Sequence, residues 1–411
     1  MSEPSIRCHL PDGTGVTARA GVSATGRLAA VVLPPNEGFS PESAGAIGLV
    51  VQRLGAQPAL GFDTAVLGAP RAFAPFAVPP FQPVQAPAWL PGSRTWRYGW
   101  AVARALRRLR PDVIEVHNRP GLALRLARAI PQAPVLLVLH NDPQGMRGMA
   151  SPAARARLRS LARVLTVSAW VRDRVMEGVP GTWPAPPVVL PNAIDPAGLP
   201  PPVPPPLRER SFLFAGRLVP EKGVACFLGA CAEALPHLSG WRAEVIGARR
   251  LQPGGAPDSY TDAMHGLARR AGVEMAGYRP HAAVAEAMAR AAVVVVPPTW
   301  PEPFGLTALE AMAGGGALIC SGVGNLRDLV GGGAVLVPPG DTGALAAAMT
   351  ALALDEPRRA ALGAAGLARA AMFDIRHGAA ALDEVRRAAL RPWHAGWRDA
   401  AGAAPFPPPP V

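Results

Sequence analysis

The chain has 411 residues, 49% of them hydrophobic, and a formal net charge of +12 at pH 7. That length exceeds what one hydrophobic core usually organises, which predicts two domains. No window offers the roughly 20 uncharged apolar residues of a transmembrane helix, and the four cysteines have neither metal-ligand nor disulfide-framework spacing. We therefore expect a cytoplasmic protein with reduced thiols. Arginine is spread along the whole chain whereas Lys222 is the only lysine, so the positive charge reflects a composition bias.

The first half of the chain alternates short β-branched runs with Ala-, Leu- and Arg-rich segments of helical period. Residues 1–26 precede this alternation and lack a clear period, so we expect a poorly ordered extension or an irregular strand pair there. Strands alternating with helices indicate a parallel, doubly wound sheet, here an N-terminal domain over residues 27–195. Its expected strands are Leu28–Leu33, Thr64–Leu67, Val113–His117, Val135–His140, Val164–Val167 and Val188–Leu190.

A proline-dense segment over residues 196–206 can neither pair as a central strand nor continue a helix, which predicts an interdomain linker. The alternation then restarts and predicts a second doubly wound α/β domain over residues 207–390. Residues 391–411 form a tail that could pack back on the N-terminal domain. The expected strands of the second domain are Ser211–Ala215, Ala243–Ile246, Val293–Val296, Ala317–Cys320 and Ala334–Val337.

Two doubly wound domains would leave a cleft at the carboxyl ends of their sheets, where ligands bind in such folds. Phe214–Arg217 ends the first strand of the second domain, and Pro220–Gly223 follows in the next loop. Gly216 would let the backbone approach a ligand, while Arg217 and Lys222 would bring two cations to one place. This pattern suits a diphosphate. A strand end with two solvated charges is an equally good interpretation of so short a pattern.

A second motif, Pro297–Leu306, follows the expected buried strand and leads into a helix. Pro303 suits a helix start, and the free amides of the residues after it would attract a phosphate. Glu302 and Glu310 lie about two helical turns apart, so their carboxylates could hold separated hydroxyls of one long ligand. The alternative is a capping glutamate followed by a solvated one, and the intervening Pro, Phe and Gly weaken it.

These motifs resemble those of the retaining glycosyltransferases of the GT-B fold, and specifically of their family 4. Glu302 and Glu310 match the two glutamates of its E-x7-E motif, and Arg217 and Lys222 match its diphosphate-binding cations. The resemblance extends from about Leu28 to Arg387. Three further segments match the family: Leu190–Asp195 resembles its P-N-G-V-D segment with Ala193 for Gly, Asp112–His117 its strand leading to an acceptor-side histidine, and Val138–Asp142 its strand whose terminal His140 lines the reaction centre.

The resemblance implies two Rossmann-like domains, a nucleotide-diphosphate sugar as donor, and transfer to a hydroxyl of a glycan, a lipid or another acceptor. It implies that Glu302 contacts the donor sugar and that Glu310 contacts the ribose. It also implies that Arg217 and Lys222 stabilise the leaving diphosphate. His140 would position the reacting groups. The other residues it implies are Gly216, Phe304, Gly305 and Leu306 on the donor side and Gly45, His117 and Asn141 on the acceptor side.

Two segments depart from the family pattern. Ala44–Ala46 keeps only the second glycine of its glycine pair, which leaves the acceptor geometry open. Gly324–Asp328 differs from its G-G-x-x-E loop, which leaves the donor base open. The chain contains no Asp-x-Asp, so we expect no metal and no cofactor, with cationic side chains and a helix N-terminus in that role.

Several other functions are compatible with parts of the sequence. Nucleic-acid binding is disfavoured because no basic helix is interleaved with aromatic residues, and dinucleotide binding because the loop after Leu33 lacks G-x-G-x-x-G. A non-catalytic sugar-nucleotide-binding protein and an epimerase-like enzyme of the same fold stay open. The family suggests bacterial surface polysaccharide or lipopolysaccharide synthesis at the inner membrane face. Arg104, Arg107, Arg108 and Arg110 could contact anionic lipid there, although a solvated helical face is the simpler interpretation.

Overall fold

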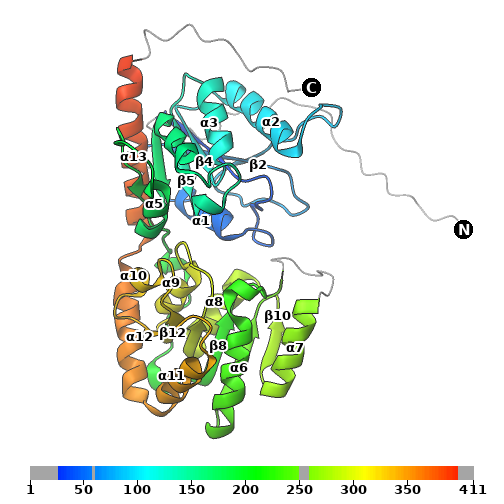
Figure 1. The fold of residues 1–411 in the computed structure, drawn as a ribbon, viewed down its shortest axis with the longest axis vertical. Coiled ribbons are helices and arrows are strands. Elements are labelled where there is room, and N and C mark those ends of the chain that lie inside the picture. The colour runs from blue at the N-terminus through cyan, green and yellow to red at the C-terminus, as the bar shows by residue number, and fades with distance from the viewer. Residues whose placement is uncertain (1–25, 58–60, 250–258, 397–411) are drawn as a thin grey trace, which may run out of the picture.

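The computed structural model describes residues 26–57, 61–249 and 259–396, which form two stacked α/β domains (Figure 1). The N-terminal domain has a seven-stranded sheet in the order β3-β2-β1-β4-β5-β6-β7, and the C-terminal domain a six-stranded sheet in the order β10-β9-β8-β11-β12-β13. Neighbouring strands run parallel throughout. The predicted fold class, two doubly wound parallel sheets, is therefore confirmed.

The strands that sequence patterning predicted are all present, each within two residues of its expected bounds. The strands are β1 Leu28–Val32, β2 Asp63–Gly68, β3 Phe81–Pro83, β4 Val113–His117, β5 Val135–Leu139, β6 Arg163–Thr166, β7 Val188–Val189, β8 Glu209–Ala215, β9 Arg242–Ile246, β10 Glu274–Gly277, β11 Ala291–Val296, β12 Ala317–Ser321 and β13 Val335–Val337. The α-helices are α1 Ala46–Gly55, α2 Arg94–Leu109, α3 Pro120–Ala129, α4 Pro152–Ala156, α5 Ala169–Met176, α6 Val224–Ala234, α7 Ser259–Ala271, α8 His281–Arg290, α9 Leu306–Ala313, α10 Leu326–Val330, α11 Thr342–Leu354, α12 Glu356–Ala371 and α13 Ile375–Gly396.

Two of these strands, β3 and β10, were missed from the sequence. Both lie at sheet edges. An edge strand pairs with a neighbouring strand on one side only and is less enclosed, so its sequence need not be a continuous apolar run. β3 is three residues long and ends on Pro83. β10 begins with the exposed Glu274, and its register shifts between Met275 and Gly277. Neither offers the pattern of a buried strand.

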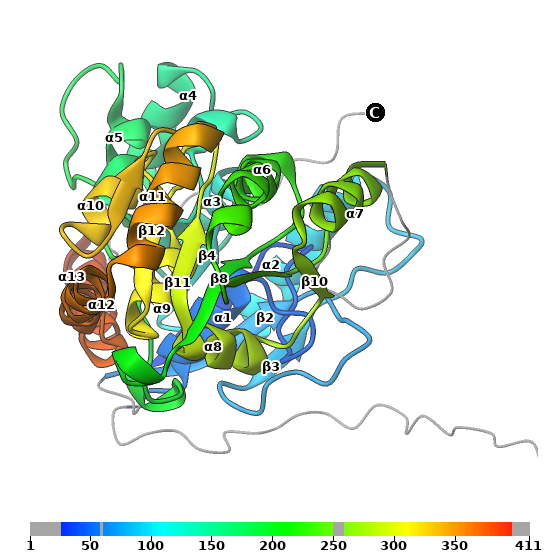
Figure 2. The ribbon, with the colours of Figure 1, turned by 90° about the horizontal axis from the view of Figure 1, so that it is seen from below.

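The central strands of the C-terminal sheet are apolar on both faces because helices cover both. Phe212 and Phe214 of β8 pack in one cluster with residues of α6, α7 and α11. Leu213 and Ala215, the alternate residues, pack in another cluster with residues of α8 and α9. This period of two places α6 and α7 on one side of the sheet and α8 and α9 on the other, as Figure 2 shows.

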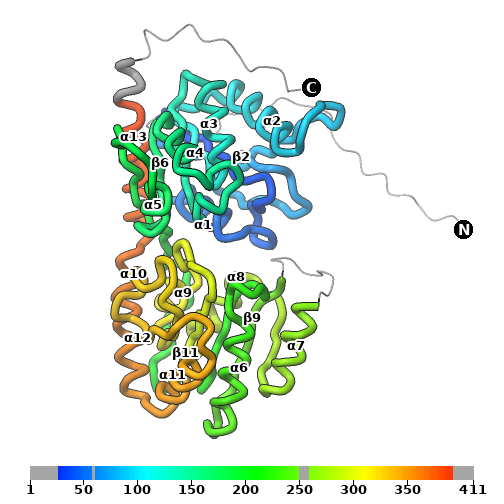
Figure 3. The backbone as a smooth tube through the Cα atoms, in the orientation of Figure 1, coloured from blue at the N-terminus to red at the C-terminus, as the bar shows by residue number. Residues whose placement is uncertain are grey.

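The N-terminal sheet is covered in the same way, but one of its covering helices comes from the far end of the chain. Ala30 and Val32 face the cluster that contains α2 and α3 residues. On the opposite face, Ala29 packs with Leu382 and Leu390 of α13. Figure 3 shows this segment, orange turning to red, running from the C-terminal domain up along the N-terminal one.

The chain crosses between the domains twice, and the two crossings are hydrogen-bonded side by side. Ile194 N donates to Phe373 O at 2.9 Å, and Ile375 N donates to Ile194 O at 2.8 Å. Residues 375–390, assigned to the C-terminal domain from the sequence, therefore pack on the N-terminal domain. From the sequence, residues 391–411 were the segment that could pack back on the N-terminal domain. The chain returns to that domain earlier, because Asp374 already lies where it crosses between the domains.

The expected extension over residues 1–26 and the end of the tail, residues 397–411, lie outside the described residues apart from Gly26. Within the ranges that are described, none of the helices is both long enough and apolar enough to cross a membrane.

Candidate active site

The loops after β8 and β11, two neighbouring strands at the centre of the C-terminal sheet, bring Lys222 and Glu302 together. The strand order reverses at this pair, which is where parallel sheets open to a ligand. Lys222 Nζ donates to Glu302 Oε2 at 2.6 Å, and the two side chains keep 27% and 20% of their surface exposed. Both side chains are thus only partly exposed, but a ligand can still reach both charges.

The backbones of the same two loops are in direct contact. Gly223 has a φ of +73°, and a Cβ at this position would overlap the carbonyl oxygen of Pro297. Thr299 N donates to Glu221 O at 3.0 Å. A residue with a side chain in place of Gly223 would push the loops apart, so glycine is required for their contact.

Arg217 lies in the first of these loops but does not join the ion pair. Its side chain is exposed and makes no hydrogen bond or salt bridge with any described residue. Gly216 before it has its carbonyl oxygen against Gly247, where a Cβ would overlap it. The loop therefore holds one paired cation and a second, Arg217, that has no partner among the described residues and can meet an anionic ligand.

Helix α9 begins at Leu306, later than Pro303, where the sequence placed its start. Gly305 is its N-cap with a φ of +102°, and Phe304 is turned into the core, where its ring meets Phe373 edge-on. Asn325 Nδ2 donates to Phe304 O at 3.1 Å. The free backbone amides at the N-terminus of this short helix therefore come directly after Gly305, which has a left-handed conformation.

The N-terminal domain also holds this loop. Ser168 Oγ donates to Pro303 O at 2.6 Å. Ser168 is the N-cap of α5 and follows β6, so the loops of the two domains meet at this point. The donor-side motif is thus anchored from both halves of the molecule.

Glu310 lies apart from the Lys222 and Glu302 pair and has its own partners. Its Oε1 accepts from Arg53 Nη2 of α1 at 3.0 Å and from His281 Nε2 of α8 at 2.8 Å. Burial raises the pKa of this carboxyl, but the hydrogen bonds and charges of His281 and Arg53 outweigh it and set the pKa below its ordinary value. Glu310 is buried, so the alternative of a solvated helical glutamate is wrong.

On the N-terminal side, the structure brings His117 and His140 into contact. His117 is the last residue of β4, and His140 directly follows the adjacent strand β5. His117 Nδ1 lies 2.9 Å from His140 Nε2. Both rings are buried. Burial, and then the nearby His117, lower the pKa of His140 well below its ordinary value. His140 is therefore neutral at physiological pH.

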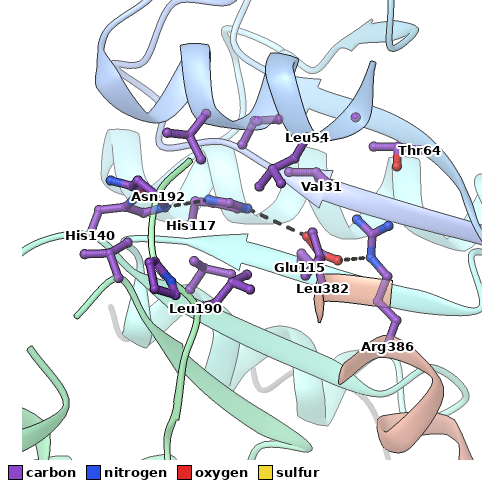
Figure 4. Close-up of a pocket in the computed structure, with 16 residues that line it drawn as sticks. Val31, Leu54, Thr64, Glu115, His117, His140, Leu190, Asn192, Leu382 and Arg386 are labelled. Carbon is purple, nitrogen blue, oxygen red and sulfur yellow. Dashed lines mark hydrogen bonds and ion pairs between the residues drawn. The ribbon is translucent and has the colours of Figure 1, made fainter. Parts of the chain in front are cut away.

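A buried ion pair lies behind the histidines. Arg386 Nε of α13 donates to Glu115 Oε1 at 2.5 Å, and Glu115 Oε2 lies 3.9 Å from His117 Nε2 (Figure 4). Burial alone would raise the pKa of Glu115, but the charge of Arg386 and the nearby His117 lower it to about 2. Glu115 is thus ionised in the middle of a buried strand.

Of the other acceptor-side residues, Gly45 is the N-cap of α1, and a Cβ there would lie 2.7 Å from Glu37 Oε1. Glu37 accepts from Gly48 N at 3.0 Å, so its carboxylate occupies this helix N-terminus. Asn141 is exposed and makes no hydrogen bond with any described residue. Asn118, which follows β4 and has a φ of +52°, accepts at Oδ1 from His140 N at 2.9 Å.

A pocket lies within the N-terminal domain, beside the two histidines (Figure 4). Its wall includes apolar side chains from β1, α1 and α13, among them Val31, Leu54 and Leu382, while Glu115 and Arg386 provide its charged end. The donor-side residues do not line it. Over the described ranges, no cluster of three or more His, Cys, Asp or Glu side chains is arranged to hold a metal.

Sequence reasoning missed Glu115, Arg386, Arg53, His281, Ser168 and Asn118 as members of the site. A signal existed for Glu115, because a carboxylate inside a buried strand requires a cation. Nothing in the sequence says that this cation is supplied from Arg386, 271 positions further along the chain.

Two solved structures define the class of this fold. Sucrose-phosphate synthase from Thermosynechococcus elongatus aligns with a TM-score of 0.71 over 88% of this chain and 98% of that chain, at 22% identity. Anabaena HepE, solved with UDP-glucose, aligns with a TM-score of 0.69 over 87% and 99%, at 18% identity. The chain has the GT-B fold.

The family follows from two sequence models. The model for glycosyl transferases group 1 matches residues 200–369, and the model for Glycosyltransferase Family 4 matches residues 49–197. The chain therefore belongs to the family 4 glycosyltransferases, which confirms the resemblance seen in its motifs.

The chain is also similar to curated proteins. An exopolysaccharide phosphotransferase of Streptomyces coelicolor is 28% identical over 266 residues, which are 62% of this chain and 26% of that protein. A D-inositol 3-phosphate glycosyltransferase of Kineococcus radiotolerans is 36% identical over 194 residues, 44% of each chain. The chain thus spans less than half the length of these relatives.

Proposed function

We propose that this protein is a retaining glycosyltransferase that moves a sugar from a nucleotide-diphosphate sugar to a hydroxyl acceptor. The observation that carries the proposal is the Lys222 and Glu302 pair at the strand-order reversal, with Arg217, which pairs with no described residue, in the same loop. Two cations match the two negative charges of a diphosphate, and a carboxylate beside them suits sugar hydroxyls. HepE, of the same fold, was solved with UDP-glucose, which supports this class of donor.

In the proposed reaction, the bond between the anomeric carbon and the diphosphate oxygen breaks, and a bond from the acceptor oxygen to that carbon forms on the same face. The acceptor proton passes to the leaving diphosphate. Lys222 and Arg217 stabilise the charge that develops there. The contact with Glu302 holds Lys222 in place before the donor arrives, so little side-chain entropy is lost on binding.

We propose that the reaction proceeds without a metal or a cofactor, because these cations and the mouth of α9 provide the positive field that a divalent ion would supply. His140, neutral and at the end of β5, would position a hydroxyl of the donor or the acceptor. Glu310 would take the ribose, as the family resemblance implies.

We further propose a glycan or lipid-linked acceptor and a role in bacterial surface polysaccharide or lipopolysaccharide synthesis. The similarity to a relative named an exopolysaccharide phosphotransferase supports the polysaccharide context. The exposed Arg104 and Arg108 of α2 would provide peripheral contact with anionic lipid at the inner membrane face, where a cytoplasmic enzyme meets such acceptors.

The proposal is tested by a screen for binding and hydrolysis of UDP, GDP and ADP sugars, with and without EDTA. We expect one donor to be turned over equally in both conditions. Lys222→Ala should lower its kcat by about 100-fold or more, the cost of removing one donor that stabilises a developing charge. Glu302→Ala should weaken binding of the sugar nucleotide more than that of the free nucleotide.

Glu221→Gln is the matched control, because this exposed carboxylate is adjacent to Lys222 and lies outside the ion pair. Binding without turnover would leave a non-catalytic sugar-nucleotide-binding protein, and an epimerised product would indicate the epimerase-like alternative. If no donor is bound, or if Lys222→Ala and Glu302→Ala behave as the parent does, the proposed function is wrong.

A further inference from the structure

We propose that Glu115 and Arg386 are positioning residues that set which ring nitrogen of His140 carries the proton. The inference deepens the proposed function and rests on it for the role of His140. It assigns a part in the reaction centre to α13, a helix that no donor or acceptor motif includes.

The four side chains form one continuous buried series (Figure 4). Arg386 contacts Glu115 at 2.5 Å, Glu115 lies 3.9 Å from His117 Nε2, and His117 Nδ1 lies 2.9 Å from His140 Nε2. All four are less than a tenth exposed. At this burial the interactions are weakly screened, so a charge at one end affects the proton positions at the other.

The direction of the effect follows from the hydrogen-bonding capacity of a neutral imidazole, which has one donor and one acceptor nitrogen. The Glu115 carboxylate favours the proton of His117 on Nε2, the nitrogen that faces it. His117 Nδ1 is then an acceptor, and the 2.9 Å contact requires His140 to donate from Nε2. His140 is left with a bare Nδ1, which can accept a hydrogen bond from a substrate hydroxyl.

Without the negative charge of Glu115, the opposite arrangement becomes available. His117 can then carry its proton on Nδ1 and donate to His140 Nε2, which places the His140 proton on Nδ1. A hydroxyl that approached that nitrogen would meet a donor instead of an acceptor. The same two rings in the same positions would therefore present the opposite polarity to the substrate.

The contacts of His117 distinguish this arrangement from a purely structural ion pair. Its Nε2 is buried and makes no hydrogen bond with any described residue, while Glu115 Oε2 lies 3.9 Å from it. A buried ring nitrogen without a partner is costly, so a small approach of the two groups, or one bridging water, satisfies both. If Arg386 and Glu115 formed only a structural ion pair, they would not need a histidine beside them.

Arg386 is held independently of the histidines. Its Nη1 donates to Asp383 Oδ1 at 2.9 Å, and its guanidinium lies 5.7 Å from the centre of the Phe62 ring. Leu382 and Leu390 of the same helix pack in the core of the N-terminal domain. The cation that keeps Glu115 ionised is thus fixed by helix packing.

The test reads the histidine tautomers directly by long-range 15N–1H NMR of the full chain labelled at histidine, with His117→Gln and His140→Gln for assignment. In the parent we expect the His140 proton on Nε2, with His117 Nδ1 as its acceptor. In Glu115→Gln the His140 proton should move toward Nδ1, and kcat should fall by about 10–100-fold, as for other residues that orient a functional histidine. KM for the donor should change by less than twofold.

Arg386→Met should give the same tautomer change in a weaker form, and Arg387→Met is its control, because Arg387 is the next residue and forms its ion pair with the exposed Glu384. The double variant Glu115→Gln with Arg386→Met removes both buried charges, so its fold is less perturbed than that of either single variant. Its tautomer should match that of Glu115→Gln.

The proposal is overturned if a folded Glu115→Gln or double variant keeps the tautomer of the parent. A failure of the proposed function gives a different result, because the tautomers are read without turnover. No donor turned over, together with a tautomer that responds to Glu115, would remove the enzymatic role and keep the proton arrangement.

Discussion

The two halves of the site are built in different ways. The donor side consists of short loops whose glycines allow backbone contacts, with a partly exposed ion pair and the exposed cation Arg217, which has no partner in the described part of the chain. The acceptor side consists of buried side chains, from His140 back to Arg386, that come from three elements far apart in the chain. One half is defined by backbone conformation and the other by a side-chain network.

This difference fits what each half would have to do. A nucleotide diphosphate has the same charges whichever sugar it carries, so a set of local loop residues suffices to bind it. A hydroxyl acceptor is neutral, and only a fixed proton arrangement distinguishes a group that accepts from one that donates. The donor side should therefore be sensitive to backbone substitutions, and the acceptor side to the removal of buried charges.

The largest effect is expected from Gly223→Ala, which would break the donor side through its backbone. The φ of +73° disfavours any side chain, and a Cβ would overlap the Pro297 carbonyl oxygen. We expect a loss of about 3 kcal/mol in the free energy of unfolding and at least a tenfold weaker binding of UDP, because Lys222 and Glu302 lie on the two loops that must separate.

Urea unfolding and calorimetric titration with UDP check this expectation. Gly332→Ala is the control, because a Cβ at Gly332 meets nothing within 4 Å. Equal behaviour of the two variants would show that the loops adapt and that the donor side is not defined by its backbone.

The same contrast explains how far the sequence could predict the molecule. The central strands were predictable, because a strand covered on both faces must be apolar, and each donor-side motif could be found because its residues lie close together in the sequence. Edge strand β10 and the start of α9 at Leu306 were not, since edge pairing and the left-handed turn at Gly305 depend on tertiary contacts. The link from Glu115 to Arg386 joins positions that no local pattern relates.

The second expectation concerns acid stability on the acceptor side. The pKa of Glu115 is lowered from an ordinary 4.5 to about 2, chiefly by Arg386 acting against its burial. A carboxyl whose pKa is lower in the folded state stabilises the fold above its unfolded pKa, and this contribution is lost as the pH falls from about 5 toward 2. The slope is up to about 1.4 kcal/mol per pH unit for one proton.

Urea unfolding between pH 5 and pH 3 should therefore show a smaller loss of stability with pH in the double variant Glu115→Gln with Arg386→Met than in the parent. Glu384→Gln, an exposed carboxamide substitution on the same helix, should retain the slope of the parent. If the double variant has that slope as well, Glu115 is not ionised in the fold, and the buried network has no charge at its centre.

The smallest effect is expected where the two halves touch. Arg53 Nη2 of the N-terminal domain and His281 Nε2 of the C-terminal domain share Glu310 Oε1, the carboxylate that we propose for the ribose. A ribose hydroxyl has to compete with Arg53 for this oxygen. Arg53→Met should therefore tighten UDP binding, by up to about fivefold, which corresponds to about 1 kcal/mol of binding free energy.

Titration of UDP into Arg53→Met and into Gln52→Met, a neutral change at the preceding position of the same helix, measures this effect. If Arg53→Met binds UDP more weakly than the parent, Arg53 contacts the nucleotide itself. In that case the bound donor contacts both domains, and Arg53 does not compete with the ribose for Glu310.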